Sequence, residues 1–165
     1  MKHYAALLAL TLALGAPAAA QNAGQIQQVQ SGQSCTECNL FQANLSYRDL
    51  PGVDLSGARL RQADLSLATM NGARFDRADM SIANLFGARF TGASFVSTNF
   101  ERATLVGAHF GGANLSRANL AGANLSGAEL DRARGLTQRQ LDAACGDQFT
   151  RLPSGLRVSP CAATQ

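Results

Sequence analysis

The chain has 165 residues, no tryptophan, sixteen glycines and a formal net charge of +3. This length allows one ordinary domain and is too short for two. Fourteen basic against eleven acidic residues, scattered along the sequence, do not form the basic stripe of a nucleic-acid-binding protein. The charge balance therefore accounts for solubility and argues against nucleic acid as a partner.

The first twenty residues have the pattern of a secretory signal peptide. Residues 1–3 are a basic start, residues 5–14 are apolar, and residues 18–20 are alanines suited to cleavage before Gln21. The apolar run is too short to span a bilayer, and no cysteine follows it for lipid attachment. For residues 1–20 we expect removal, and for the mature chain a bacterial periplasmic or secreted location without membrane contact.

Residues 21–37 come next and are expected to form an N-terminal linker and cap. Up to Ser34 the segment is rich in glutamine and poor in apolar residues, so we expect it to be mobile at first and strand-like near residues 26–29. Cys35 lies near its end, three residues before Cys38, which is the first residue of the next segment.

From residue 38 to residue 132 the sequence is an uninterrupted five-residue repeat. The central residue of each of the nineteen units is large and apolar: twelve Leu, five Phe and two Met. Two residues before the centre the residue is usually small, and it is alanine in fifteen units. The exceptions are Cys38, Arg48, Val53 and Thr98.

A strict period of five excludes the two ordinary secondary structures. On an α-helix, steps of five advance by about 500° and would spread the large residues around the circumference. On a flat strand, an odd period alternates faces and would expose half of them. The chain must instead turn a corner once per unit, so that every centre points to one axis and the coils stack through backbone hydrogen bonds. The sequence therefore predicts a β-solenoid.

Units such as Ala-Asn-Leu-Ser-Gly at 123–127 and Ala-Asp-Leu-Ser-Leu at 63–67 resemble the pentapeptide-repeat family. The resemblance implies an all-β fold, a right-handed quadrilateral β-helix with four units per coil. The centre and the small residue two before it then point inward, and the other three positions point outward. Residues twenty apart stack, which gathers the Phe centres in the middle coils. Arg48 departs from this pattern and puts the regularity of the first coil in question.

Residues 133–165 are expected to cap the last coil, because open strand edges need cover. Thr137 and Gln140 have the spacing of a capping box, and Gly146 is suited to end a helix. We therefore expect a short capping helix at about 138–145, followed by an irregular stretch.

The four cysteines allow three pairings. Cys35 and Cys38 lie at the base of the stack and Cys145 and Cys161 at its top, farther apart than the ~7 Å limit between bridged α-carbons. We therefore expect the disulfides Cys35–Cys38 and Cys145–Cys161, formed in an oxidising compartment.

The Cys35–Cys38 pair has two other interpretations. A redox-active pair would account for the spacing, but Cys38 occupies an inward repeat position and the motif does not lie between a strand and a helix. A metal site would need a third and a fourth ligand nearby, which the sequence lacks. We favour a structural disulfide, and thiol titration of the native protein distinguishes it from a redox pair.

We find no catalytic constellation in the sequence. His109 is the single histidine of the expected mature chain, and it stacks in the outer column Asp49, Thr69, Arg89, His109 and Glu129. It is either a general base between a cation and a carboxylate or one member of a polar surface ladder. Proton transfer needs a concave, partly desolvated site, which a flat solenoid wall lacks. We therefore expect no enzyme activity, no cofactor and no metal.

One wall of the predicted solenoid is nearly uncharged. It is built on the units centred on Leu45, Leu65, Leu85, Leu105 and Leu125. Asp64 is its only charge. Its outward apolar residues align in two columns, with one more at the neighbouring corner, and the candidate interface is Tyr47, Leu67, Ile82, Phe86 and Val106. A connected apolar strip indicates an interface, whereas single exposed apolar residues are common on monomers.

These observations favour an exported, non-enzymatic scaffold that binds a protein partner or itself through this wall. The family resemblance offers a second function, mimicry of duplex DNA as a topoisomerase inhibitor. The members that do this are acidic and cytoplasmic, whereas this chain is mildly basic and carries an export pattern. A redox protein that uses Cys35 and Cys38 is the third interpretation.

Overall fold

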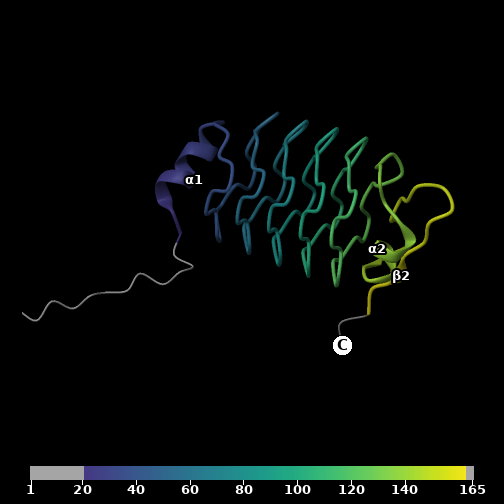
Figure 1. The fold of residues 1–165 in the computed structure, drawn as a ribbon. Helices are drawn as coiled ribbons and strands as arrows, with labels where there is room; N and C mark the ends of the chain where they lie inside the picture. Colours follow the sequence, from purple (N-terminus) through teal and green to yellow (C-terminus); the bar gives the residue numbers. More distant parts are fainter. Residues whose placement is uncertain (1–20, 163–165) are drawn as a thin grey trace, which may run out of the picture.

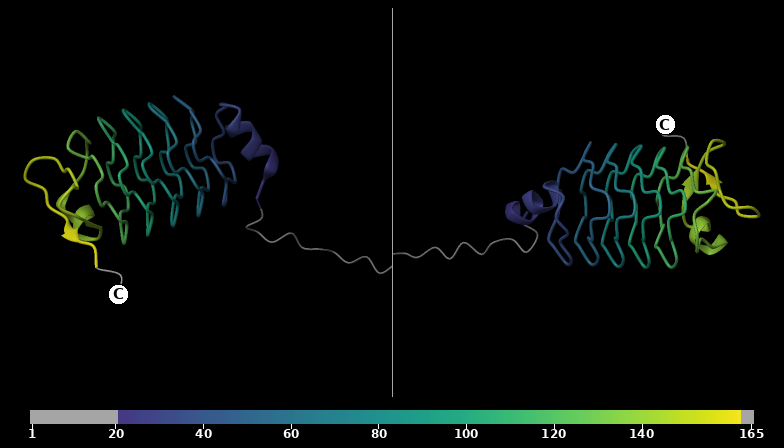
Figure 2. Two further views of the ribbon diagram at one scale, coloured as in Figure 1. Left: turned by 180° about the vertical axis from the view of Figure 1, so that it is seen from behind. Right: turned by 90° about the horizontal axis from the view of Figure 1, so that it is seen from above.

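The structure is a computed structural model that describes residues 21–162. Helix α1 (Ala23–Gln30) is followed by a stack of coils, helix α2 (Gln138–Asp142) and two short parallel strands, β1 (Cys145–Gly146) and β2 (Ser159–Pro160). The coils lie between α1 at one end and α2, β1 and β2 at the other (Figure 1). Two further views show the same single stack (Figure 2). The expected signal peptide lies outside the described residues.

Backbone hydrogen bonds join the coils with a register of twenty residues. Parallel bridges pair the residue before each centre with its equivalent one coil later, as in Asn44 with Asp64 and Asn84 with Thr104. The bridges involve single residues rather than extended strands, because the chain turns after every unit. Four units therefore make one coil.

Each corner is a tight turn closed by the backbone. The N–H of the small residue donates to the carbonyl of the preceding centre, for example from Ala58 to Leu55 at 3.1 Å. In eighteen of the nineteen units the second residue after the centre has positive φ, as a type II turn requires. Nine of the nineteen units have glycine there, and nine others adopt φ of 53–60° with a side chain. Ile82, at 57°, is β-branched, and such residues are strained in this conformation.

We expect Ile82→Gly to raise the free energy of unfolding by about 0.5–1 kcal/mol, because it relieves the left-handed strain and gives back part of the gain as glycine entropy. The reciprocal change, Gly72→Ile, should lower it by a similar amount. Gly72 has φ of 68° and no atom within 4 Å of an added Cβ, so the backbone strain is isolated there. Urea denaturation measures both changes. Equal stability of all three proteins would contradict the strain argument.

The inward positions form one continuous core. All nineteen centres are at most 3% exposed. Phe75 stacks on Phe95 with ring centroids 5.0 Å apart, and Phe90 stacks on Phe110 at 5.5 Å. Phe90 and Phe95 meet edge to face at 5.2 Å, a preferred aromatic geometry. The predicted gathering of Phe centres in the middle coils is confirmed.

Two residues that depart from the alanine pattern are accommodated in different ways. Thr98 is fully buried, and its hydroxyl donates to the carbonyl oxygen of Phe75 at 2.6 Å, so its polar atom is satisfied. Arg48 turns outward and is exposed. Its carbonyl still accepts from the N–H of Thr69 at 2.8 Å. The backbone of the first coil therefore stays regular where the side chain leaves the core.

The N-terminal segment is a helix, so the expectation of a strand-like stretch near residues 26–29 is wrong. The side chain of Asn22 accepts from the N–H of Gln25 at 3.1 Å and caps α1. Val29, near the end of the helix, is completely buried. The low apolar content misled the prediction, because two apolar residues, the buried Val29 and the partly buried Ile26, pack this short helix against the core.

Glutamine side chains cover the open backbone edge of the first coil. Gln25 Oε1 accepts from the N–H of Asn39 at 2.8 Å. Gln30 Nε2 donates to the carbonyl of Asn44 at 2.8 Å. An uncovered coil edge is a template for unwanted strand pairing, so these side chains serve as the N-terminal cap.

The C-terminal cap continues the stack with a shifted register. Beyond α2, Cys145 pairs with Asn124 and Arg151 pairs with Glu129. These separations are one and two residues longer than the regular twenty. The shift follows from the inserted helix and loop, which interrupt the five-residue period.

Helix α2 is shorter than predicted and ends at Asp142. The predicted capping interaction is present, since Gln140 Oε1 accepts from the N–H of Thr137 at 2.9 Å. Gly146 does not end the helix, which corrects the prediction, and lies in β1. A Cβ at Gly146 would lie 2.6 Å from Thr150 Oγ1, so glycine is required there for close packing.

Candidate interaction surface

The uncharged wall comprises the outward residues of the five units centred on Leu45, Leu65, Leu85, Leu105 and Leu125. The apolar strip on it consists of Tyr47, Leu67, Phe86 and Val106, with Ile82 at the adjoining corner. Tyr47 is 75% exposed, Phe86 49% and Leu67 43%, and the other two are half-buried. The structure thus places all five candidate residues on one side of the solenoid, within four successive coils.

Leu67 lies over the glycine of the next coil. A Cβ at Gly87 would come within 2.8 Å of Leu67 Cδ2, so the glycine leaves the space that this side chain fills. One side of the Leu67 side chain therefore packs against the backbone at Gly87, and the rest of the side chain stays exposed to solvent. Apolar patches of this kind, bordered by polar residues, mark interaction sites.

Polar side chains of the uncharged wall are engaged within the wall itself. In four of the five units, the side-chain oxygen of the residue before the centre accepts from the N–H of the residue after it, for example from Ser66 to Asp64 at 2.9 Å and from Phe86 to Asn84 at 3.1 Å. The amide of Asn84 also donates to the carboxylate of Asp64 at 3.1 Å. These internal hydrogen bonds reduce the cost of covering the wall, because a hydrogen-bonded polar group is less costly to bury.

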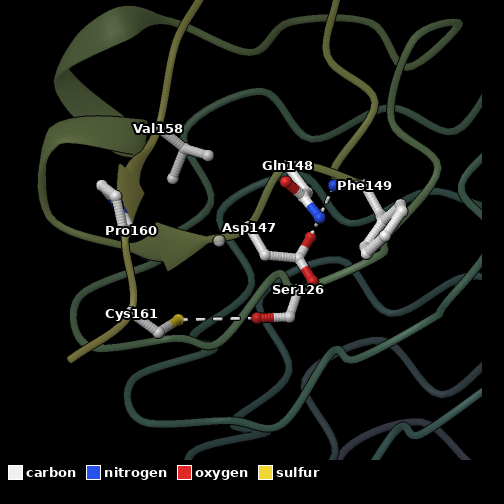
Figure 3. A pocket seen from close by; sticks show the side chains of 8 residues that line it. Ser126, Asp147, Gln148, Phe149, Val158, Pro160 and Cys161 are labelled. Atoms are coloured by element: carbon white, nitrogen blue, oxygen red, sulfur yellow. Dashed lines mark hydrogen bonds between the residues drawn. The ribbon is translucent and has the colours of Figure 1, made fainter. Parts of the chain in front are cut away.

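A pocket opens at the top of the uncharged wall, one coil above Val106. It is lined by Ser126, Gly146, Asp147, Gln148, Phe149, Val158, Pro160 and Cys161. Phe149 stands on one side, with Val158 and Pro160 on the other (Figure 3). Phe149 is 68% exposed. The pocket extends the apolar surface from the coils onto the cap.

Sequence reasoning missed this pocket. Residues 146–161 follow no five-residue period, so nothing in the pattern places them against Ser126. The one available signal was an aromatic residue, Phe149, in a polar stretch.

Asp147 fastens the loop of the pocket to the solenoid. Its Oδ1 accepts from the N–H of Gly127 at 2.8 Å and from the N–H of Phe149 at 3.0 Å. The hydroxyl of Thr150 donates to the same oxygen at 3.1 Å. These hydrogen bonds, that from Gly127 above all, lower the pKa of Asp147 because they favour the charged carboxylate.

We expect acid to loosen this loop. The lowered folded-state pKa means that the unfolded chain binds the proton more readily, so the stabilisation is present above the ordinary carboxyl pKa of about 4 and is lost as pH falls through the folded value. The Tm of the wild-type protein should therefore fall more on acidification than that of Asp147→Asn, which keeps an oxygen acceptor without this titration. Asp54 and Glu129, whose pKa values are also lowered, titrate in both proteins. Equal falls in Tm would contradict this role.

The polar ladder around His109 is present on another wall. Bridges join Asp49, Thr69, Arg89, His109 and Glu129 in that order. His109 Nδ1 lies 3.0 Å from Glu129 Oε2, with 38% and 41% of the two side chains exposed. The hydrogen bond from His109 is the main cause that lowers the pKa of Glu129. This exposure fits a surface ladder better than a desolvated acid–base pair.

Both disulfides join the cysteines that the sequence pairs. The Cα–Cα distance is 5.6 Å for Cys35–Cys38 and 4.7 Å for Cys145–Cys161. Cys35 and Cys38 are only 6% and 5% exposed and lie in the core. Such burial hinders access by a redox partner and favours a structural bridge.

Residues 21–162 form neither a metal-binding cluster nor a membrane-spanning helix. No group of three or more His, Cys, Asp or Glu side chains in this part of the chain could hold a metal ion. None of the helices described is long and apolar enough to cross a membrane.

Comparison with known proteins identifies the repeat. A family model described as pentapeptide repeats matches eight copies, in residues 38–77, 83–120 and 98–134. No curated protein matches the chain.

Several solved structures are similar. HetL, a pentapeptide repeat protein involved in heterocyst differentiation regulation from the cyanobacterium Nostoc sp. strain PCC 7120, is 32% identical over 78% of this chain and 61% of its own, with a TM-score of 0.44. A pentapeptide repeat protein of the Arabidopsis thaliana thylakoid lumen is 30% identical over 65% and 57%, with a TM-score of 0.36. QnrB1, a plasmid-mediated fluoroquinolone resistance protein, is 19% identical over 72% and 84%, with a TM-score of 0.29. The chain spans less than two thirds of the first two proteins. Its sequence match over more than half of its length shows that it belongs to the pentapeptide repeat family.

Proposed function

We propose that this protein is an exported interaction scaffold, a right-handed four-sided solenoid that binds protein through its uncharged wall. The apolar strip is the observation that carries the proposal. Tyr47, Leu67 and Phe86 are large, exposed and aligned on the wall whose single charge, Asp64, is hydrogen-bonded internally. Covering such a strip removes apolar surface from water without burying an unpaired charge.

Export is supported by the cysteines as well as by the N-terminal pattern. All four cysteines are paired, and disulfides persist in oxidising compartments rather than in the cytosol. Mass spectrometry of the protein from envelope and medium fractions tests this part of the proposal. The expected mature chain begins at Gln21, and recovery of a full-length chain from the cytoplasm would contradict export.

Mimicry of duplex DNA lacks a supporting observation in this protein. A DNA mimic needs a surface of negative charge, whereas the expected mature chain has thirteen arginines against eleven acids. A gyrase supercoiling assay with the purified protein is expected to show no inhibition.

The scaffold proposal is tested by a charge placed on the strip. The double variant Phe86→Glu with Leu67→Glu should keep the fold, because both side chains are exposed, and should lose protein partners in affinity purification from envelope and medium fractions. The control is Val96→Glu, which puts a single glutamate on the opposite wall. Circular dichroism checks the fold of both variants. Retention of the same partners by all three proteins would overturn the proposal.

A further inference from the structure

We propose that the partner of the uncharged wall is the uncharged wall of a second copy of this chain, in an antiparallel arrangement. The inference rests on the proposed function and specifies its partner. Four successive coils supply the surface, each through outward residues within one range: 42–47, 62–67, 82–87 and 102–107. They are called coils one to four.

Large and small residues follow opposite orders in two neighbouring columns of this wall. The corner column reads Tyr47, Leu67, Gly87 and Gly107 from coil one to coil four. The column beside it reads Ser46, Ser66, Phe86 and Val106. The corner column therefore has its large side chains on coils one and two, and the column beside it has its large side chains on coils three and four.

Consider a two-fold axis that lies between coils two and three and runs parallel to the backbone of the coils on this wall. Such an axis pairs the large residues of each column with the small residues of the same column in the second copy. It brings coil one against coil four of the second copy and coil two against coil three, while each column faces itself. Tyr47 then faces Gly107 of the second copy, where no atom lies within 4 Å of the Cβ position. Phe86 faces Ser66, and Val106 faces Ser46. Each large side chain of these two columns therefore meets a small residue, as a self-complementary interface requires.

Leu67 lies nearest to the proposed axis. Its side chain leans over Gly87 of its own chain, toward coil three. The two copies of Leu67 therefore approach each other across the axis. A central apolar contact surrounded by polar residues is the usual arrangement of an interface hot spot.

The charges of the wall also suit this arrangement. Asp64 faces Asn84 of the second copy. Arg102, at the corner beside Val106, faces Gln42. Neither Asp64 on the wall nor Arg102 at its corner is opposed by a like charge, and like-charge opposition is what commonly prevents two copies from pairing.

The size of the surface sets the expected affinity. Four coils present sixteen outward residues per copy, compared with about 20–30 in a standard interface. We therefore expect a weak dimer that depends on protein concentration, with a Kd on the order of micromolar.

Sedimentation of the purified mature protein over a range of concentrations tests the pairing. The wild type and Val96→Glu should pass from monomer to dimer, and Leu67→Glu should stay monomeric. Position 42 tests the antiparallel register. Gln42→Glu places two carboxylates opposite the two copies of Arg102 and should lower Kd about three- to tenfold, whereas Gln42→Arg should raise it by a similar factor.

The outcomes separate this inference from the proposed function. A wild-type protein that stays monomeric overturns the pairing, and the scaffold proposal still stands if partner capture is lost in Phe86→Glu with Leu67→Glu. A monomer whose partner capture is also unchanged by that variant overturns both. A dimer that ignores Leu67→Glu places the contact on another surface. A dimer that responds to Leu67→Glu but equally to both Gln42 variants overturns the antiparallel register.

Discussion

Replacing Phe95 with alanine is expected to lower the free energy of unfolding by about 3–5 kcal/mol, because the change removes a fully buried ring and leaves a cavity. Phe95 stacks on Phe75 and meets Phe90, Phe100 and Phe110 with ring centroids 5.0–5.6 Å apart. It is therefore the ring with the most aromatic neighbours among the core contacts of residues 21–162. Urea denaturation followed by circular dichroism measures the loss.

The matched control is Phe86→Ala, which removes the same side chain from a position that is 49% exposed. Its effect should stay within about 0.5–1 kcal/mol, since a surface substitution leaves no cavity. A comparable loss for both variants would mean that Phe86 is structural, and that the apolar strip is part of the fold rather than a free surface.

Removing the Cys145–Cys161 disulfide is expected to destabilise the C-terminal cap by about 3 kcal/mol, through the double variant Cys145→Ser with Cys161→Ser. The bridge closes a loop with a sequence separation of 16, and loops of that length restrict the unfolded chain by roughly this amount. The loss should remain local, because each coil of a solenoid contacts only its neighbours.

Hydrogen exchange tests both the size and the place of this loss. The N–H of Leu125 donates to the carbonyl of Cys145 at 2.7 Å, and this amide should lose protection. The N–H of Phe90, in the middle coils, should keep its protection. The matched control is the double serine variant of Cys35 and Cys38, whose separation is only 3 and whose effect should be smaller and confined to the other end. An equal loss of amide protection in all coils would contradict a local effect of the disulfide.

The repeat predicted the stacked coils and their core correctly, because the side chain at every fifth position has a single environment. The cysteine pairing was also predicted correctly, because the two ends of the stack are too far apart to be bridged. Phe75 and Phe95 stack as their separation of twenty requires. Handedness of the coils stays a prediction. The effect of single exceptions to the pattern was harder to predict. Arg48 breaks the alanine pattern, yet the backbone hydrogen bond at this position is the same as in the regular units.

The two ends show where sequence reasoning failed. Glutamines such as Gln25 and Gln30 act through hydrogen bonds to the free edge of the first coil, and such contacts leave no period in the sequence. Gly146 looked like a helix terminus because its packing partner, Thr150, reaches it only through the fold of the cap. The pocket beside Phe149 was missed for the same reason.

The period of five alone was enough to establish the turn after every unit and the inward set of large residues, because neither a helix nor a flat strand buries every centre. The stacking of residues twenty apart was implied by the resemblance to the pentapeptide-repeat family, which has four units per coil. The apolar strip followed from that stacking, because residues twenty apart in the sequence become neighbours on one wall. Only the tertiary structure decided how the ends are covered and how Leu67 lies over Gly87. Those features depend on contacts between segments that share no repeat, and on the free backbone groups that stacking leaves at the first and last coils.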